Sequence, residues 1–228
     1  MESGNQNFLL VNISILKIKI YILDCGFGNI ESVFNAISYL GHKPVVVSDL
    51  NKIKFATHLI LPGVGNFFKA AEKIKLLNIK AKIKDFVSNG GLLLGICLGM
   101  QLLFKYGEEG GKSEGLNFFN YKCTSFNKVK KFNLPLPHIG FSKVTHPDTK
   151  IWKDIDNPSD FYFVHSYMIG IDMLKNNNSP NIKFGLTEYF TKFISYIEYD
   201  RVFGAQFHPE KSQNNGLKFL NNFINYND

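Results

Sequence analysis

The sequence predicts an α/β protein of three layers, with helices on both faces of a mixed, mainly parallel central sheet. In the first half of the chain, short runs rich in Ile, Leu and Val alternate with amphipathic segments. Strands that are apolar on both faces are typical of a parallel sheet covered by helices. In the second half, short strand-like runs follow one another across polar turns, which indicates antiparallel additions to the sheet.

The first half contains the predicted alternation of strands and helices. Asn29 precedes a helical pattern as a candidate cap, and Gly41 follows the pattern as a stop signal. Pro62-Gly63 closes the third strand, and Asn89-Gly90-Gly91 closes a long helical segment. The predicted strands are 18–23, 44–47, 58–61 and 92–96, and the predicted helices are 30–40, 66–89 and 98–104.

The second half contains more strands and a closing helix. The predicted strands are 121–130, 161–167, 183–187, 193–199 and 202–207. A helix is predicted at about 215–226, because its apolar residues recur at helical spacing. These residues are Leu217, Phe219, Leu220, Phe223 and Ile224. Open α/β sheets place ligands at the carboxyl ends of their parallel strands, so we expect the functional turns there.

Length and composition indicate one globular domain. The chain has 228 residues, of which 45% are hydrophobic, and this is enough for one substantial core. We assign 17–228 to the domain and 1–16 to an N-terminal extension. The apolar runs are far shorter than the ~20 residues that span a bilayer. We therefore expect no membrane contact and a cytoplasmic location.

Charge and cysteine content narrow the function classes. Cys25, Cys97 and Cys123 form neither a disulfide framework nor a CxxC metal pattern, so we expect a reducing compartment, no metal and no cofactor. The net charge is +7, but the lysines are dispersed and no base-stacking motif accompanies them. We expect no nucleic-acid partner. The surplus charge fits a docking face for an acidic protein or a solvated surface.

Cys97 is the candidate nucleophile. It follows the apolar run Leu92-Leu93-Leu94 and has Gly95 and Gly99 two residues away on either side. A strand-to-helix turn around a nucleophile is tight, and glycines fit beside it without a clash. The amides of the following helix point at the sulfur and favour the thiolate. Cys25 and Cys123 lack this setting and are interpreted as core residues.

A cysteine nucleophile needs a base and a group that orients the base. His208 follows a predicted strand, Pro209 stiffens the turn, and Glu210 lies two residues beyond the histidine. If both side chains project to the same side, Glu210 holds one ring nitrogen of His208 while the other faces Cys97. His165, on an apolar strand, is interpreted as a packing residue or a wall of the substrate site.

Acyl transfer also needs donors for the developing oxyanion. The backbone amide of Leu98, directly after the nucleophile, is one candidate. The turn Gly63-Val64-Gly65 is the second, because its glycines allow the backbone to approach a substrate closely or to flip. We expect this turn to be misaligned until a partner protein engages.

Several motifs together resemble the class I (triad) glutamine amidotransferases, and within them the glutaminase subunits of imidazole glycerol phosphate synthase. The resemblance covers about residues 18–226 and implies a flavodoxin-like core. The motifs are Asp24-Cys25-Gly26-Phe27-Gly28-Asn29, Leu61-Pro62-Gly63-Val64-Gly65, Gly95-Ile96-Cys97-Leu98-Gly99-Met100-Gln101, Pro137-His138-Ile139-Gly140, Phe163-Val164-His165-Ser166-Tyr167 and Gln206-Phe207-His208-Pro209-Glu210-Lys211.

The resemblance implies roles for further residues. Gln101 and Glu109 would bind the glutamine substrate, Glu109 through its amino group. The backbone of Ser166 and Tyr167 would contact the substrate carboxylate.

The implied reaction converts L-glutamine and water into L-glutamate and ammonia through a thioester on Cys97. Ammonia would pass to a separate (β/α)₈-barrel cyclase in a heterodimer, for imidazole glycerol phosphate and AICAR formation in histidine biosynthesis. Asn29, Phe141 and Lys211 would face that cyclase.

Two departures from the family pattern leave alternatives open. Phe141-Ser142 stands where the family usually has Trp-Asn, and Cys25 stands where it usually has tyrosine. A paralogous subunit that feeds a cyclase-like partner, aminating a sugar nucleotide for cell-surface glycans, is the main alternative. A partner-free γ-glutamyl peptidase or cysteine hydrolase and a non-catalytic binding module are the others.

Overall fold

Strands and helices alternate through the first half of the computed structural model, which describes residues 18–128, 135–175 and 181–226. The described elements of that half are β1 (Ile20–Leu23), α1 (Ile30–Tyr39), β2 (Val45–Val47), η1 (Leu50–Phe55), β3 (His58–Gly63), α2 (Phe67–Leu76), α3 (Ile79–Ser88), β4 (Leu92–Cys97), α4 (Leu98–Leu102), β5 (Phe104–Gly107) and β6 (Ser113–Glu114). The proposed extension, residues 1–16, lies outside the described residues.

The second half is mostly strands. Its elements are β7 (Phe119–Ser125), η2 (Phe126–Lys128), β8 (His138–Val144), η3 (Lys150–Trp152), β9 (Ser159–His165), β10 (Tyr167–Gly170), α5 (Asp172–Lys175), β11 (Lys183–Glu188), β12 (Lys192–Tyr199), β13 (Val202–Ala205), η4 (Pro209–Lys211) and α6 (Gln213–Ile224).

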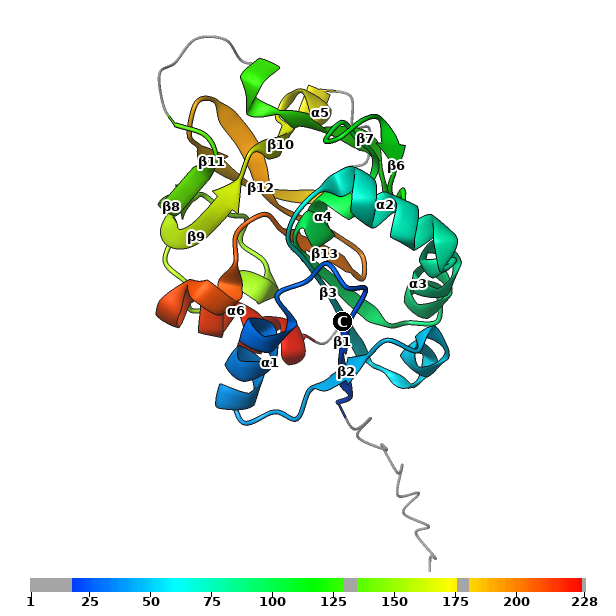
Figure 1. Cartoon of the computed structure of the whole chain (residues 1–228). Helices are drawn as coiled ribbons and strands as arrows, with labels where there is room; N and C mark the ends of the chain where they lie inside the picture. Colours follow the sequence, from blue (N-terminus) through cyan, green and yellow to red (C-terminus); the bar gives the residue numbers. More distant parts are fainter. Residues whose placement is uncertain (1–17, 129–134, 176–180, 227–228) are drawn as a thin grey trace, which may run out of the picture.

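One large mixed sheet runs through the molecule (Figure 1). Its strand order is β2-β1-β3-β4-β13-β12-β10-β7-β5-β6, with β11 paired to β12. The strands from β2 to β13 run parallel, and β12 and β10 continue the sheet antiparallel. The predicted fold class, α/β with a mixed, mainly parallel central sheet, is confirmed.

Helices cover both faces of the parallel strands (Figure 1). Along β3, Ile60 packs in one core cluster with α1 and α6, while Leu59 and Leu61 pack in the other with α2 and α3. All three side chains are fully buried. This two-sided burial explains why the first-half strands are apolar at successive positions rather than at alternate ones.

A second, two-stranded sheet was not predicted. The sequence prediction of one strand at 161–167 is wrong, because β9 ends at His165 and β10 begins at Tyr167. β9 pairs with β8 in the small sheet, whereas β10 pairs with β7 and β12 in the large one. Ser166 is the residue between the two sheets.

The helices also differ from the prediction at three places. The predicted helix 66–89 is two helices, because Asn78 adopts the left-handed conformation at φ 52° between α2 and α3. The helix after Cys97 ends at Leu102, and Phe104 already begins β5. Asn29 occupies the cap position of α1, but its side chain makes no capping hydrogen bond.

Two further observations bear on the function classes. Within the described ranges, no helix is long and apolar enough to cross a membrane. In the same ranges, no group of three or more His, Cys, Asp or Glu side chains is arranged to hold a metal ion.

Candidate active site

The nucleophile turn lies at the carboxyl end of β4, in the middle of the parallel strands. Cys97 has φ 54° and ψ −110°, a strained conformation for a residue with a side chain. A Cβ on Gly99 would lie 1.8 Å from the Leu61 carbonyl oxygen, and one on Gly95 would lie 2.7 Å from the Gly99 backbone. The turn therefore closes only with glycine at both positions, as predicted.

The predicted oxyanion turn is beside the nucleophile. Gly63, the last residue of β3, is the register partner of Cys97 across the parallel β3–β4 ladder. A Cβ on Gly63 would lie 2.7 Å from the Gly99 amide nitrogen, so the two turns are in close backbone contact. Leu98 follows Cys97 as the first residue of α4 and is buried.

The Val64 amide is already engaged. Its N–H donates to the carbonyl oxygen of Phe27 at 2.6 Å. Phe27 belongs to the loop before α1, so that loop holds the oxyanion turn in its present orientation. Gly65 has φ +102°, a conformation that glycine adopts freely. In this orientation the Val64 N–H is not available to an oxyanion at Cys97.

His208 and Glu210 form a buried pair next to β13. Nδ1 of His208 lies 2.7 Å from Oε1 of Glu210, and both side chains are almost completely buried. Within the described residues, Nε2 of His208 has no hydrogen-bond partner. One ring nitrogen is thus held by the carboxylate and the other is left for a reacting group, which is the arrangement predicted from the His-Pro-Glu spacing.

Neighbouring charges control the protonation of His208. Burial alone would lower the pKa of the ring, but the interactions with Cys97 and with the Glu210 carboxylate outweigh burial and raise the pKa to about 10. The His208 ring is therefore protonated at neutral pH.

Ser212 and Gln206 are two site residues that the sequence analysis missed. Ser212 Oγ donates to the His208 carbonyl at 2.6 Å and accepts from the Tyr162 amide at 2.9 Å. Gln206 is fully buried, and its Nε2 donates to Cys97 Sγ at 3.7 Å. A glutamine at the end of an otherwise apolar strand run was the available signal, since buried polar side chains need partners.

Gln101, predicted to bind substrate, faces inward from α4. Its Nε2 donates to the Tyr167 carbonyl at 3.2 Å and to Gln206 Oε1 at 3.0 Å. Its side-chain amide therefore holds two neighbouring parts of the site in place.

Glu109 lies at the amino end of α2. Its Oε2 accepts from the Phe67 amide at 2.9 Å, where a carboxylate also meets the helix dipole favourably. Burial raises the pKa of Glu109, and the Phe67 amide opposes this only in part. After burial, the charge of Glu109 also raises the pKa of Tyr167 and of Cys123, so the carboxylate lies near both residues.

Ser166 and Tyr167 lie where β9 passes close to the nucleophile. The Cys97 thiol points at the carbonyl of Val164 at 3.9 Å. The Ser166 carbonyl accepts from the Phe126 amide at 3.2 Å. The short segment from Val164 to Tyr167 thus forms one wall beside the sulfur.

Phe141 and Lys211 share an outer surface. Phe141 is about half exposed and contacts Tyr162 across the β8–β9 pair, with ring centroids 5.6 Å apart. Lys211 Nζ lies 5.9 Å from the centroid of the same Tyr162 ring. Asn29 is half-buried at the start of α1, a helix that contacts η4. The three predicted interface residues therefore lie around one side of the catalytic turns.

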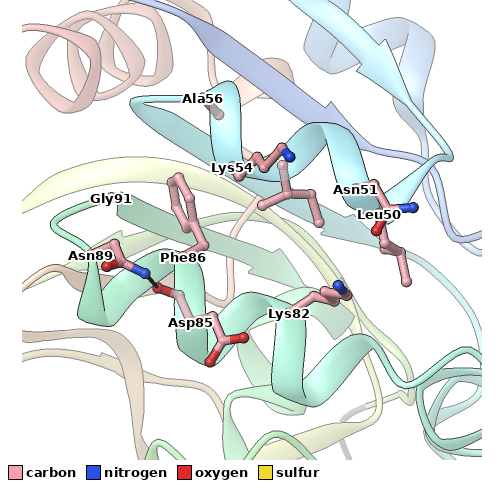
Figure 2. A pocket seen from close by; sticks show the side chains of 10 residues that line it. Leu50, Asn51, Lys54, Ala56, Lys82, Asp85, Phe86, Asn89 and Gly91 are labelled. Atoms are coloured by element: carbon pink, nitrogen blue, oxygen red, sulfur yellow. Dashed lines mark hydrogen bonds between the residues drawn. The ribbon is translucent and has the colours of Figure 1, made fainter.

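The hollow drawn in Figure 2 is a separate feature of the surface. It is a cavity of about 380 Å³ between η1 and α3, lined in part by Lys54, Lys82 and Phe86. Ala56 and Gly91 also line this cavity, and they lie just before the first residues of β3 and β4. Cys97 lies at the opposite end of β4, so this cavity is not the candidate site.

Comparisons with known proteins agree with this geometry. The family model for glutamine amidotransferase class-I matches residues 21–226. A protein of Caldanaerobacter subterraneus subsp. tengcongensis, "Imidazole glycerol phosphate synthase subunit HisH", is 42% identical over 89% of this chain and 95% of its own length. A protein of the same name from Sulfurimonas denitrificans is 39% identical over 91% of this chain and 98% of its own length.

Solved structures show the same fold at lower identity. The structure of PurLQS from Thermotoga maritima matches with a TM-score of 0.67 at 17% identity, over 92% of this chain and 98% of that chain. A crystal structure of a glutamine amidotransferase matches with a TM-score of 0.66 at 14% identity, over 90% of this chain and 98% of that chain.

A mixed, mainly parallel sheet covered by helices, with Cys97 on a strained strand-to-helix turn, defines the chain as a three-layer α/β protein. Within that class, the chain belongs to the class I glutamine amidotransferase family.

Proposed function

We propose that this chain is a glutaminase subunit that hydrolyses L-glutamine to L-glutamate and ammonia, with Cys97 as nucleophile, His208 as general acid and base, and Glu210 as the group that orients His208. The observation that carries the proposal is the buried His208–Glu210 contact of 2.7 Å with a raised His208 pKa beside Cys97. Relatives named as subunits of imidazole glycerol phosphate synthase support it.

The reaction follows from the charges at the site. The Cys97 thiolate attacks the amide carbon of the glutamine side chain, and the carbonyl oxygen becomes an oxyanion. The C–N bond then breaks, and the His208 imidazolium gives its proton to the leaving nitrogen, which departs as ammonia. Water, deprotonated by the now neutral His208, attacks the thioester carbon, and glutamate leaves as the Cys97–carbon bond breaks.

Substrate recognition is assigned to the surrounding polar groups. Glu109 supplies a negative charge for the amino group of glutamine, and the backbone of Ser166 and Tyr167 meets its carboxylate. Gln101 holds the Tyr167 carbonyl and so fixes this segment. These contacts select a substrate whose α-amino and α-carboxylate groups are both free.

The oxyanion site is proposed to depend on a partner. Leu98 supplies one backbone donor, but the Val64 N–H is bound to the Phe27 carbonyl at 2.6 Å. Rotation of the peptide between Gly63 and Val64 would free this donor and turn it toward Cys97. Docking of a second protein against the neighbouring loops is the proposed trigger, and it would restrain ammonia release by the unpaired subunit.

The partner is proposed to be a (β/α)₈-barrel cyclase, with which the chain forms a cytoplasmic heterodimer of imidazole glycerol phosphate synthase. The word "subunit" in the relatives' names supports a partner. The surface that carries the exposed Phe141 and Lys211, together with the half-buried Asn29, is the proposed docking site. The ammonia then serves histidine biosynthesis. The names of the relatives do not favour the glycan-modifying alternative.

Covalent labelling tests the proposal directly. A glutamine-like diazo ketone, added to the chain together with its cyclase, should place one adduct on Cys97 by peptide mass mapping. The Cys97→Ala variant should take up no label, whereas Cys123→Ala should label as the parent chain does. Ammonia release in the same samples should follow the label. An unlabelled Cys97 in the assembled complex would contradict the proposed function.

A further inference from the structure

Two buried histidines join a surface serine to the wall of the active site. His138 and His165 face each other across the β8–β9 pair, with His138 Nδ1 3.1 Å from His165 Nε2. On the outer side, His138 Nε2 lies 2.9 Å from Ser142 Oγ. On the inner side, His165 Nδ1 lies 2.8 Å from the Tyr167 carbonyl oxygen. Both rings are buried.

The contacts continue from Tyr167 to the nucleophile. The Tyr167 carbonyl also accepts from Gln101 Nε2 at 3.2 Å. Gln101 Nε2 contacts Gln206 Oε1 at 3.0 Å, and Gln206 Nε2 donates to Cys97 Sγ at 3.7 Å. A connected set of hydrogen bonds therefore runs from half-buried Ser142 on β8 to the Cys97 sulfur.

The chemistry of the groups fixes the proton positions. A peptide carbonyl only accepts, so Nδ1 of His165 carries a proton. Burial lowers the pKa of His165 to about 3 and that of His138 to about 4, so both rings are neutral at pH 7. Nε2 of His165 must then accept from Nδ1–H of His138, and Nε2 of His138 must accept from the Ser142 hydroxyl.

We propose that His138 and His165 are positioning residues, which act through the Tyr167 carbonyl, Gln101 and Gln206 to hold the hydrogen bond donated to the Cys97 sulfur. The proposal rests on the proposed function for its catalytic consequence, but not for the hydrogen bonds themselves. Neither histidine touches the sulfur. Their effect is to give the Tyr167 carbonyl a second donor, which keeps this acceptor fixed and with it the Gln101 amide.

A packing role alone does not account for this arrangement. His138 stacks on Tyr189, with ring centroids 4.0 Å apart, and on Phe163 at 4.8 Å. A phenylalanine would satisfy those stacks without burying two ring nitrogens. Burying such polar groups costs free energy unless each finds a partner, and here each of the four ring nitrogens has one.

Nitrogen NMR of the unmodified full chain at pH 7 tests the proton positions. The nitrogen signals of both histidines should be those of a neutral ring with the proton on Nδ1. The signals that disappear in His138→Phe belong to His138, and those that disappear in His165→Phe belong to His165. The Ser142→Ala variant should shift the Nε2 signal of His138. A proton on Nε2 of either ring would overturn the proposal, because the hydrogen bonds could then not all be donated in the direction from Ser142 to the Tyr167 carbonyl.

Alkylation kinetics test the link to Cys97 without relying on glutamine turnover. The probe is iodoacetamide, and the rate at Cys97 is read by peptide mass mapping. His138→Phe keeps the aromatic stack and removes the relay, so the rate at pH 7 should fall about fivefold, the equivalent of one hydrogen bond of about 1 kcal/mol. Tyr189→Phe is the matched control, because among the described residues its hydroxyl donates to the Pro135 carbonyl and not to the relay, and its rate should stay within twofold.

A glutaminase assay of the assembled complex separates the two proposals. If the parent complex releases ammonia, His138→Phe should lower kcat about fivefold and change KM less. If the parent complex releases none, the proposed function fails, while the NMR and alkylation results still decide the positioning role. An alkylation rate that is unchanged in both His138→Phe and Ser142→Ala would overturn the positioning role. If His138→Phe does not fold, the rate in Ser142→Ala alone tests that role.

Discussion

At the scale of single residues, Glu210 is the group whose change should be most informative. It is nearly completely buried, and its only described hydrogen bond is the 2.7 Å contact with His208 Nδ1, since Oε2 has no partner in the described chain. Burying a carboxylate with one hydrogen-bond partner costs free energy of folding unless an opposite charge compensates. Against the lowering effect of burial, Cys97 and then Glu210 raise the pKa of His208, and the 2.7 Å contact with Glu210 orients the ring.

Glu210→Gln should therefore change both activity and the pH dependence of stability. Because the folded-state pKa of His208, about 10, lies above the 6.5 of free histidine, ring protonation stabilises the fold fully below pH 6.5. This contribution is lost as the pH rises toward 10. Urea unfolding at pH 6, 8 and 10 should show a steep loss of unfolding free energy in the parent chain and a shallower one in Glu210→Gln.

The activity of the same variant should fall much further than its stability. Removing the orienting carboxylate from such a triad costs several orders of magnitude in kcat, so we expect ammonia release by the Glu210→Gln complex to drop by about 10³-fold. Equal slopes of stability against pH in the two chains would refute the assigned role of Glu210.

Glu109→Gln should separate substrate binding from chemistry. The side-chain amide oxygen of the substituted residue can still accept from the Phe67 amide, so α2 should remain folded. The unfolding free energy should fall by about 0.5 kcal/mol, because the negative charge at the amino end of α2 is missing. The KM for glutamine should rise about tenfold, as expected for one charged hydrogen bond, and kcat should change less than twofold. A fall in kcat at constant KM would contradict the assignment.

At the scale of elements, the nucleophile turn depends on backbone contact between neighbouring strands and α4. The tightest contact is at Gly99, where a Cβ would lie 1.8 Å from the Leu61 carbonyl oxygen. That oxygen is part of β3 and cannot rotate away as a side chain could. α4 therefore lies against β3 with no room for a methyl group.

Gly99→Ala should cost more than about 3 kcal/mol of unfolding free energy, because overpacking against backbone is not relieved by rotamer changes. Gly41→Ala is the matched control. Gly41 has φ +84° after α1 but nothing within 4 Å of its Cβ position, so only the cost of the left-handed conformation, about 1 kcal/mol, is expected. Chemical denaturation followed by circular dichroism measures both, and equal losses would disprove the contact argument.

The elements also show what the sequence could and could not predict. The Cys97 turn was predictable because its signals are local: an apolar run, two glycines and a helical pattern within a few residues. The break at Ser166 was not, because strand-like residues stand on both sides of His165 and Ser166, and only pairing with distant strands assigns β9 and β10 to different sheets. The Val64 amide was equally hidden, since its partner Phe27 is far away in sequence.

Within the site, residue types were more predictable than their partners. The spacing alone predicted that Glu210 lies next to His208, because a single residue, Pro209, separates them in the turn. Gln206 and Ser212 escaped notice because their roles come from contacts with Cys97 and Tyr162 in other elements. Short-range chemistry can be inferred from a sequence, but a hydrogen bond between distant segments needs the fold.

At the scale of the whole molecule, the outer surface around Phe141 should control partner association. Phe141 is 49% exposed, and aromatic side chains are enriched at protein–protein interfaces. Phe141→Asp should weaken binding of the cyclase by at least tenfold in titration calorimetry and leave the Tm of the isolated chain unchanged.

Leu76→Asp is the control for the same change of charge, since Leu76 is 82% exposed at the end of α2. It should bind as the parent chain does. The net charge of +7 also predicts that association with an acidic cyclase slows as salt is raised from 50 to about 300 mM. Salt-independent association, or equal loss in both variants, would exclude this surface as the docking site.

The division between the two sheets has a mechanical consequence. Ser166 links the two sheets, because Val164 and His165 belong to β9 of the small sheet and Tyr167 belongs to β10 of the large one. The sheets are also tied just beyond the end of β8, where the Thr145 and Leu186 amides each donate to the other's carbonyl, at 2.8 and 2.7 Å. A load on the outside of β8 and β9 would therefore pass into the large sheet at both places.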